Sequence, residues 1–234
     1  MTEATKSPPR NAAGFNYTCL AVVFLVALAL ILRPIWNEKK HHDFGQFYMG
    51  ATMARLGEWS AIYPEPVPTS NVNPGWPRGS TMKPAYAAAA AERGVDNTFR
   101  YIQLPPNALL YYPLALLSVQ NAYRLWHAVM ICFIVITAAL AGQIYDAMRG
   151  GDDDDGRRSI AAGLVTLLVG CSPLMIYTAR VSNTGPLLSA CFGAAILGML
   201  RPERRRPWGT ALGVTIGGMT KYAPGVLVPV LFSM

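Results

Sequence analysis

Residues 125–145 read LWHAVMICFIVITAALAGQIY, and this stretch decides the fold class. It contains no Asp, Glu, Lys or Arg, and it is long enough to cross a bilayer unaided, since a membrane-spanning helix needs about 20 apolar residues. Residues 160–179 form a second stretch of the same kind. Because a helix satisfies its own backbone hydrogen bonds in lipid, two such stretches predict an all-α, polytopic membrane bundle.

Further apolar segments lie on both sides of these two. Residues 17–32 run into Arg33-Pro34-Ile35-Trp36, which is not a small-x-small cleavage site, so we expect an uncleaved first transmembrane helix over residues 17–36. The remaining apolar segments are short or broken by proline, namely 104–119, 185–200, 208–220 and 222–234. Broken helices are tolerated where neighbours or a water-filled cavity satisfy the freed backbone groups, which favours a cavity-forming bundle over a simple anchor.

The composition agrees with a membrane protein. Hydrophobic residues make up 52% of the chain and charged residues only 14%, whereas a soluble domain carries roughly a quarter charged residues. These values exclude a disordered chain and a coiled coil. We attribute the net charge of +7 to basic loops at an anionic cytoplasmic leaflet and expect no nucleic-acid partner. The four cysteines lie in apolar runs without Cys-x-x-Cys spacing, so we interpret them as small hydrophobic residues.

Arginines in two loops set the expected orientation. Four arginines fall within residues 201–206, and Arg157 and Arg158 mark a second loop; both loops are therefore predicted to be cytoplasmic. The tail of residues 1–16 is then cytoplasmic, residues 37–100 form an external loop, and residues 101–234 form the remaining transmembrane region. This orientation requires that residues 104–119 form a proline-broken re-entrant or half-depth helix.

The composition of the external loop differs from that of the apolar segments, because the loop is polar, aromatic and rich in proline. Asp43 and Gln46 have the spacing of a helix capping box. The residues that follow place an apolar face at helical spacing, which predicts an amphipathic helix lying on the bilayer surface. That face consists of Phe44, Phe47, Tyr48 and Ala51. The alanine-rich residues 85–93 predict a second short helix.

Charged residues near the membrane boundary are the candidate functional residues. Asp43 is either a helix N-cap or a reactive carboxylate at the outer membrane face, and the two roles are compatible. Lys221 lies between apolar segments, so it either serves a functional site or extends its ammonium group to the interface. Arg180 is a similar cation at an outer edge, beside the turn of residues 182–185. The adjacent His41 and His42 lack a third ligand, so we predict no metal site.

Several motifs occur in order along nearly the whole chain. They are DFGQFY at 43–48, GEWSAIY at 57–63, YIQLPPNALLYYPLA at 101–115, SNTGPLL at 182–188, and the segment from Gly213 through Lys221 to Pro224. This ordered set resembles glycosyltransferase family 87, the polyprenol-phosphate-mannose-dependent mannosyltransferases of the GT-C superfamily. The sequence departs from the family at Leu104, where the family usually has tyrosine, and at the turn of residues 182–185, where it often has Gly-Gln-x-Asn.

The resemblance implies a GT-C-like enzyme of the inner membrane. It would move a hexose, with mannose favoured, from a polyprenyl-phosphate donor to an acceptor hydroxyl of a glycan, lipid or protein on the external side. Asp43 would accept the hydroxyl proton during a direct displacement with inversion, and Lys221 or Arg180 would stabilise the departing phosphate. No cofactor is implied, and the metal requirement stays open. The other substrate-binding candidates are Asn183, Gln46, Tyr48 and His42.

Two other classes of protein stay open at this stage. A transporter or flippase would carry charges in several membrane helices, and a non-catalytic scaffold would use the external loop as a partner surface. The last apolar segment, residues 222–234, has only thirteen residues. This is too short for a span, so we expect the chain to be the N-terminal portion of a longer enzyme.

Overall fold

The structure is a computed structural model that describes residues 10–35, 42–63, 65–66, 80–81, 83–95, 105–149 and 155–200. Within these residues the chain is helical apart from one short antiparallel pair, β1 (Glu65–Pro66) with β2 (Ser80–Thr81). The all-α fold class is therefore confirmed. The predicted segments 208–220 and 222–234 lie outside the described residues, and so does Lys221.

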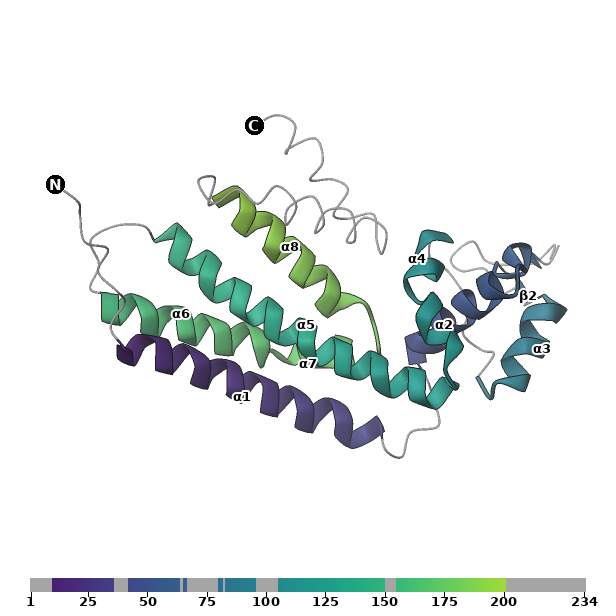
Figure 1. Ribbon diagram of the computed structural model, residues 1–234, viewed down its shortest axis with the longest axis horizontal. Helices are drawn as coiled ribbons and strands as arrows, with labels where there is room; N and C mark the ends of the chain where they lie inside the picture. The colour runs from purple at the N-terminus through teal and green to yellow at the C-terminus, as the bar shows by residue number, and fades with distance from the viewer. Residues whose placement is uncertain are drawn as a thin grey trace, which may run out of the picture.

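The long helices of the described chain form an elongated bundle (Figure 1). Its members are α1 (Arg10–Ile35), α5 (Val119–Met148), α6 (Asp155–Gly170), α7 (Pro173–Arg180) and α8 (Gly185–Leu200). Helix α5 is central, because it contacts all the others. Three stretches are long and apolar enough to cross a membrane, namely Gly14–Arg33, Val119–Met148 and Gly156–Arg180. The chain is therefore a membrane protein.

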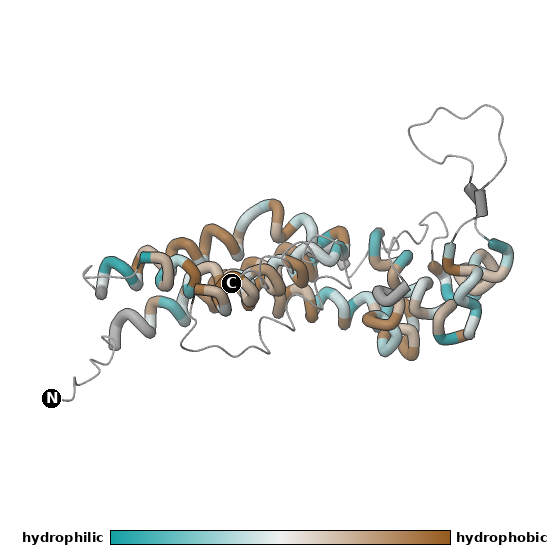
Figure 2. The backbone as a smooth tube through the Cα atoms, turned by 90° about the horizontal axis from the view of Figure 1, so that it is seen from above, coloured by the Kyte–Doolittle hydropathy of each residue, from teal (hydrophilic) through white to brown (hydrophobic). Residues whose placement is uncertain are grey.

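Helix α1 buries one set of its apolar side chains against neighbouring helices and exposes another set. Its buried positions recur every fourth residue and form one stripe, made of Cys19, Val23, Ala27 and Ile31. On its other faces Leu25 is 60% exposed and Leu30 is 51% exposed. An outer face of this kind suits contact with lipid, and Figure 2 shows hydrophobic residues along the bundle with hydrophilic residues toward its ends.

Small residues allow the bundle helices to approach closely. At Gly170, where α6 meets α1 and α5, an added Cβ atom would lie 2.5 and 2.7 Å from the two methyl groups of Val23 and 3.0 Å from the Cβ of Ala138. No side chain fits there without displacement of a neighbour. Close approach at small residues is the usual way in which helices pack in membranes, where burial of apolar surface gives little driving force.

A second group of helices lies at one end of the bundle, where α1 ends and α5 begins (Figure 1). It contains α2 (His42–Arg55), η1 (Trp59–Ala61), α3 (Pro84–Glu92), α4 (Pro105–Leu110) and η2 (Tyr112–Leu116). Neither α4 nor η2 is long enough to cross a membrane, which agrees with the prediction that residues 104–119 do not span. Their depth in a membrane stays a prediction.

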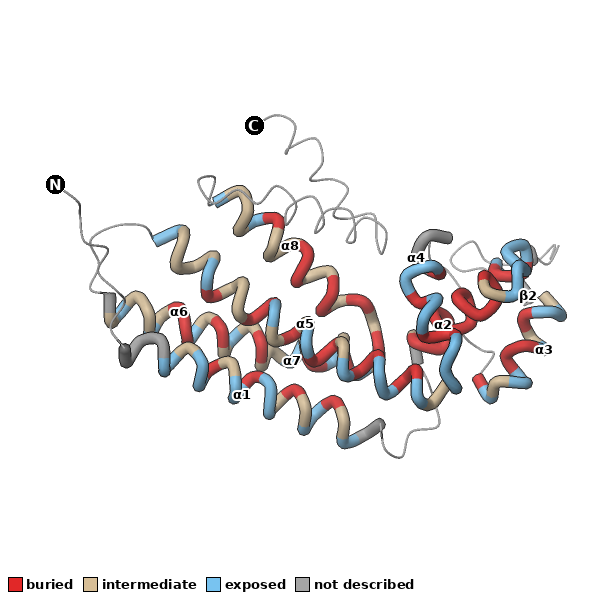
Figure 3. The backbone as a smooth tube through the Cα atoms, viewed as in Figure 1, coloured by how far each residue is buried: buried red, intermediate tan, exposed pale blue. Residues whose placement is uncertain are grey.

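Helix α2 corrects the prediction of an amphipathic surface helix. Every residue from Phe44 to Ala54 is buried, so α2 has no exposed face along most of its length (Figure 3). The physical reason is that α3, α4, η2 and the beginning of α5 surround it. A helix enclosed in this way needs apolar or small residues on all sides, whereas a helix on a surface needs them on one.

The opposite end of the bundle gathers the start of α1, the end of α5, the start of α6 and the end of α8 (Figure 1). Here Arg158 of α6 lies 2.7 Å, Nε to Oδ1, from Asp146 of α5, and it also donates to the Asp146 carbonyl oxygen. Arg149 is the C-cap residue of α5, and Arg157 lies in the first turn of α6 at the same end. Helix α1 starts at Arg10, earlier than the predicted boundary at residue 17.

Candidate functional site

The site is built on the turn that joins α7 to α8. Helix α7 ends in a Schellman motif, in which the N–H of Ser182 donates to Ala179 and the N–H of Asn183 donates to Thr178, both at 2.9 Å. Ser182 has a φ of 63°, the left-handed conformation that this motif requires. The turn therefore has a fixed backbone, and Asn183 projects from a defined position at its tip.

The first turn of α2 lies against this turn. The backbone N–H of Asp43 donates to the carbonyl oxygen of Val181 at 3.3 Å. The side-chain Nδ2 of Asn183 donates to Oδ2 of Asp43 at 3.2 Å. Two residues that the sequence had singled out separately, one as catalytic and one as substrate-binding, are thus in direct contact. Both are partly exposed.

The predicted capping box at Asp43 is wrong. In a capping box the side chain of Gln46 would accept from the backbone N–H of Asp43, but this N–H donates to Val181 instead. Helix α2 begins at His42, so Asp43 lies inside its first turn. Gln46 is only 6% exposed, and its Oε1 has no hydrogen-bond partner among the residues that the structure describes. The hydrogen bond from Asp43 to Val181 takes the place of the expected local hydrogen bond from Asp43 to Gln46.

Helix α5 holds the turn from the other side. The hydroxyl of Ser182 lies 3.1 Å from Nε2 of His127, and Nδ1 of His127 lies 2.9 Å from the carbonyl oxygen of Tyr123. Trp126 donates its Nε1–H to the carbonyl oxygen of Ser182 at 3.4 Å. Ser182 and His127 are fully buried. The sequence analysis missed both, although a histidine within an apolar span is itself a signal for a functional residue.

Aromatic rings in contact fix α2 on the bundle beside this turn. The ring centroids of Phe44 and Tyr123 are 5.5 Å apart, those of Phe47 and Tyr111 are 4.8 Å apart, and those of Tyr111 and Trp126 are 4.6 Å apart. Aromatic pairs at such distances each contribute about 0.5–1.5 kcal/mol beyond simple burial. These pairs connect α2, which carries Asp43, to α5.

Tyr48 links three helical segments. It is fully buried, its hydroxyl donates to the Leu117 carbonyl oxygen at 2.8 Å, and it accepts from Nη1 of Arg93 at 2.9 Å. It therefore joins α2 to the ends of η2 and α3. A buried hydroxyl that both donates and accepts within the protein is a structural link, and the role of Tyr48 in substrate binding stays a prediction.

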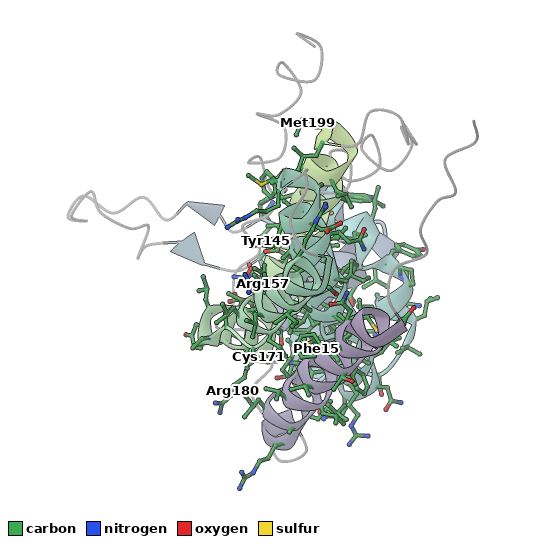
Figure 4. The ribbon with its side chains drawn as sticks, turned by 90° about the vertical axis from the view of Figure 1, so that its left-hand side faces the viewer. Phe15, Tyr145, Arg157, Cys171, Arg180 and Met199 are labelled. Carbon is green, nitrogen blue, oxygen red and sulfur yellow. The ribbon has the colours of Figure 1, made fainter. Side chains whose placement is uncertain are left out.

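The remaining candidates are placed less directly. Arg180 ends α7, is exposed, and points away from the bundle at the end that carries Asp43 (Figure 4). The backbone of His42 begins α2, and Lys221 lies outside the described residues. Among the described residues no group of three or more His, Cys, Asp or Glu side chains could hold a metal ion.

The arrangement supports proton transfer at a membrane boundary. A carboxylate lies at the junction of the bundle and the smaller helices, and an amide donor fixes one of its oxygens. A carboxylate oriented in this way can accept a proton from a hydroxyl group that reaches it. The exposed guanidinium of Arg180 can pair with an anionic group near the same end.

Comparison with known families identifies the chain. The sequence model of Glycosyltransferase family 87 matches residues 101–234, which is more than half of the sequence. The chain belongs to glycosyltransferase family 87. It is therefore a glycosyltransferase, as the ordered motifs had indicated. The family match includes Arg180 and Asn183, whereas Asp43 lies before it. Searches of curated proteins and of solved structures gave no match.

Proposed function

We propose that this family 87 glycosyltransferase transfers a hexose from a polyprenyl-phosphate donor to an acceptor hydroxyl, with mannose as the favoured sugar. Transfer takes place on the external side of the inner membrane and inverts the anomeric centre. The observation that carries the proposal is the hydrogen bond between Asn183 and Asp43, because it orients a carboxylate where the membrane bundle meets the extramembrane helices.

The chemistry needs one base and one cation. In the proposed step the acceptor oxygen attacks the anomeric carbon while Asp43 takes the hydroxyl proton. The bond between the anomeric carbon and the phosphate oxygen breaks, and the polyprenyl phosphate leaves as an anion. A phosphate anion needs positive charge but no proton to leave, and Arg180 and Lys221 are the proposed sources of that charge.

The orientation follows from the distribution of arginines. Arg149, Arg157 and Arg158 lie at the bundle end away from Asp43. Since basic residues concentrate in cytoplasmic loops, this end is proposed to be cytoplasmic. The end that carries α2, α3 and α4 is then external, where an acceptor meets a lipid-linked sugar.

A transfer assay with purified protein in lipid nanodiscs tests the proposal. Polyprenyl phosphates carrying radiolabelled mannose, glucose or galactose are supplied with a panel of glycan, lipid and peptide acceptors. We expect labelled product from the mannose donor, with release of polyprenyl phosphate and inverted anomeric configuration by NMR. Transfer only from a nucleotide sugar, or retention of configuration, would contradict the proposal.

A further inference from the structure

Three helices of the described chain end with the same left-handed cap. The residue in the left-handed conformation is Gly57 after α2, Gly94 after α3 and Ser182 after α7, with φ values of 78°, 67° and 63°. Each N–H donates to the residue three positions earlier, to Ala54, Ala91 and Ala179 respectively. Glycine adopts this conformation without strain, whereas a residue with a Cβ atom does not. The α7 cap therefore has a strained residue where the other two have glycine.

The hydroxyl group explains why serine is present. The Tyr123 carbonyl oxygen can only accept, so Nδ1 of His127 carries the proton of that hydrogen bond. In the neutral ring Nε2 is then an acceptor, and the Ser182 hydroxyl donates to it at 3.1 Å. Both side chains are fully buried, so water does not replace this bond. Glycine would satisfy the backbone but would lose this side-chain hydrogen bond between the tip of the turn and α5.

This bond acts on the residue that orients the carboxylate. Asn183 directly follows Ser182, and its side-chain amide holds Oδ2 of Asp43. A shift of the Ser182 backbone therefore moves Asn183 and, with it, the acid. Trp126 supports the same position, because it donates to the Ser182 carbonyl oxygen. A continuous set of contacts thus runs from α5 to Asp43.

We propose that Ser182 and His127 are positioning residues, which hold Asn183 so that its amide fixes the Asp43 carboxylate for proton transfer. This inference rests on the proposed role of Asp43 as the base. It differs from a simple structural cap in one respect. A cap alone would work as well or better with glycine, whereas a positioning hydroxyl cannot be replaced by glycine without loss of turnover.

The first test compares Ser182→Gly with the wild-type enzyme. Glycine keeps the left-handed cap and relieves its strain, which offsets the cost of leaving the buried Nε2 of His127 without its donor, so the melting temperature should change little. Turnover should fall roughly 10- to 100-fold with the KM for the donor unchanged, because small misplacements of a reacting group have effects of this size. His127→Gln keeps an acceptor and should retain more turnover than His127→Leu. Thr166→Val removes a buried hydroxyl on α6 and is the matched control.

Two further measurements tie the effect to the carboxylate. In the Asp43→Asn background, Ser182→Gly should cause no additional loss, since residues that act as a unit are not additive. Independently of activity, disulfide formation between cysteines introduced by Asp43→Cys and Asn183→Cys reports how well the turn holds the two residues together. This crosslink should form more slowly when Ser182→Gly is added.

The outcomes separate the inference from the proposed function. If the wild-type enzyme transfers no sugar but the crosslink slows, the proposed function is wrong and the positioning role stands. If transfer is measurable, the inference requires a slower crosslink and a loss of turnover that disappears in the Asp43→Asn background. An unchanged crosslink, unchanged turnover, or a loss that persists in that background would each overturn it.

Discussion

The side-chain amide of Asn183 donates a 3.2 Å hydrogen bond to Oδ2 of Asp43, across 140 positions of sequence. One residue belongs to a helix outside the bundle and the other to a turn between two bundle helices. An amide that donates to one carboxylate oxygen restricts the rotation of the whole carboxyl group. The contact therefore determines the direction in which the proposed base faces its substrate.

Asp43→Asn keeps the size of the side chain but removes its ability to accept a proton from the acceptor hydroxyl. We expect turnover to fall by roughly 10²–10⁴-fold, the usual contribution of a positioned general base. Asp43→Glu keeps the chemistry but shifts the carboxylate by about one methylene, so its loss should be smaller. Initial rates with a labelled donor, measured at matched protein levels, check both expectations.

The control for Asp43→Asn is Glu92→Gln, which removes an exposed carboxylate from the end of α3 in the same group of helices. It should leave turnover and membrane insertion unchanged. If Asp43→Asn has the same activity as the wild-type enzyme, the proposed mechanism loses its base.

Asn183→Ala removes the amide donor and leaves the carboxylate in place. A hydrogen bond to a charged group contributes about 1.5–3 kcal/mol, so kcat/KM should fall by roughly 10- to 150-fold. Asn183→Asp should be worse, because it places a second negative charge beside Asp43. Steady-state kinetics compare the kcat/KM of the two variants with that of the wild-type enzyme. A greater loss with alanine than with aspartate would mean that charge at this position is unimportant.

Tyr48→Phe distinguishes a structural role of this hydroxyl from the predicted role in substrate binding. It leaves the Leu117 carbonyl oxygen and the Arg93 guanidinium each without this partner, which should cost about 1–3 kcal/mol of stability. The melting temperature should fall while the KM for the donor is unchanged. Tyr112→Phe, at a partly exposed tyrosine of η2, is the control. A raised KM with an unchanged melting temperature would support the predicted substrate role of Tyr48.

Gly170→Ala adds a methyl group where α6 meets α1 and α5. The nearest atoms are the Val23 methyl groups, which cannot rotate away because a β-branched side chain in a helix has one preferred rotamer. We expect a loss of about 1–3 kcal/mol despite the better helix propensity of alanine. Gly14→Ala has no atom within 4 Å and should be neutral or stabilising. Thermal unfolding in detergent compares the two, and equal melting temperatures would contradict the close packing.

Single cysteines introduced by Glu58→Cys and Arg157→Cys test the orientation. Both positions are exposed. Glu58 follows α2 and Arg157 lies in the first turn of α6, and Figure 1 shows α2 and the start of α6 at opposite ends of the molecule. A membrane-impermeant maleimide is applied to cells whose outer barrier has been opened but whose inner membrane is closed. It should label position 58, and it should label position 157 only after the inner membrane is permeabilised. Labelling of both positions from the same side would overturn the proposed topology.

The sequence predicted the spans well because hydropathy is a local property. The apolar stretches at residues 125–145 and 160–179 lie within the candidate spans Val119–Met148 and Gly156–Arg180. The same logic fails for α2, whose apolar face of Phe44, Phe47, Tyr48 and Ala51 predicted an amphipathic helix on the bilayer surface. Its other faces are also buried, and nothing within fourteen residues indicates how many neighbours will surround them.

The site was predictable residue by residue but not as an arrangement. Asp43 and Asn183 could each be selected by chemistry and resemblance, yet their contact depends on how α2, α5 and α7 pack. Ser182 was not predicted because a serine in a turn is not unusual, whereas His127 lies within an apolar span and was overlooked despite that signal. Only the positive φ of Ser182 shows that serine has replaced the easier glycine, and backbone angles cannot be read from composition.

The separation of Asp43 from Asn183 also orders events during synthesis. The chain is synthesised from its N-terminus, so α2 is made long before α7 and α8. Before the α7–α8 turn has been made, the backbone N–H of Asp43 lacks its acceptor at Val181, and the carboxylate of Asp43 lacks its donor at Asn183. Long-range contacts of this kind form late. Asp43, the proposed base, therefore gains these contacts only after both later helices have been made, and shorter nascent chains carry its carboxylate without them.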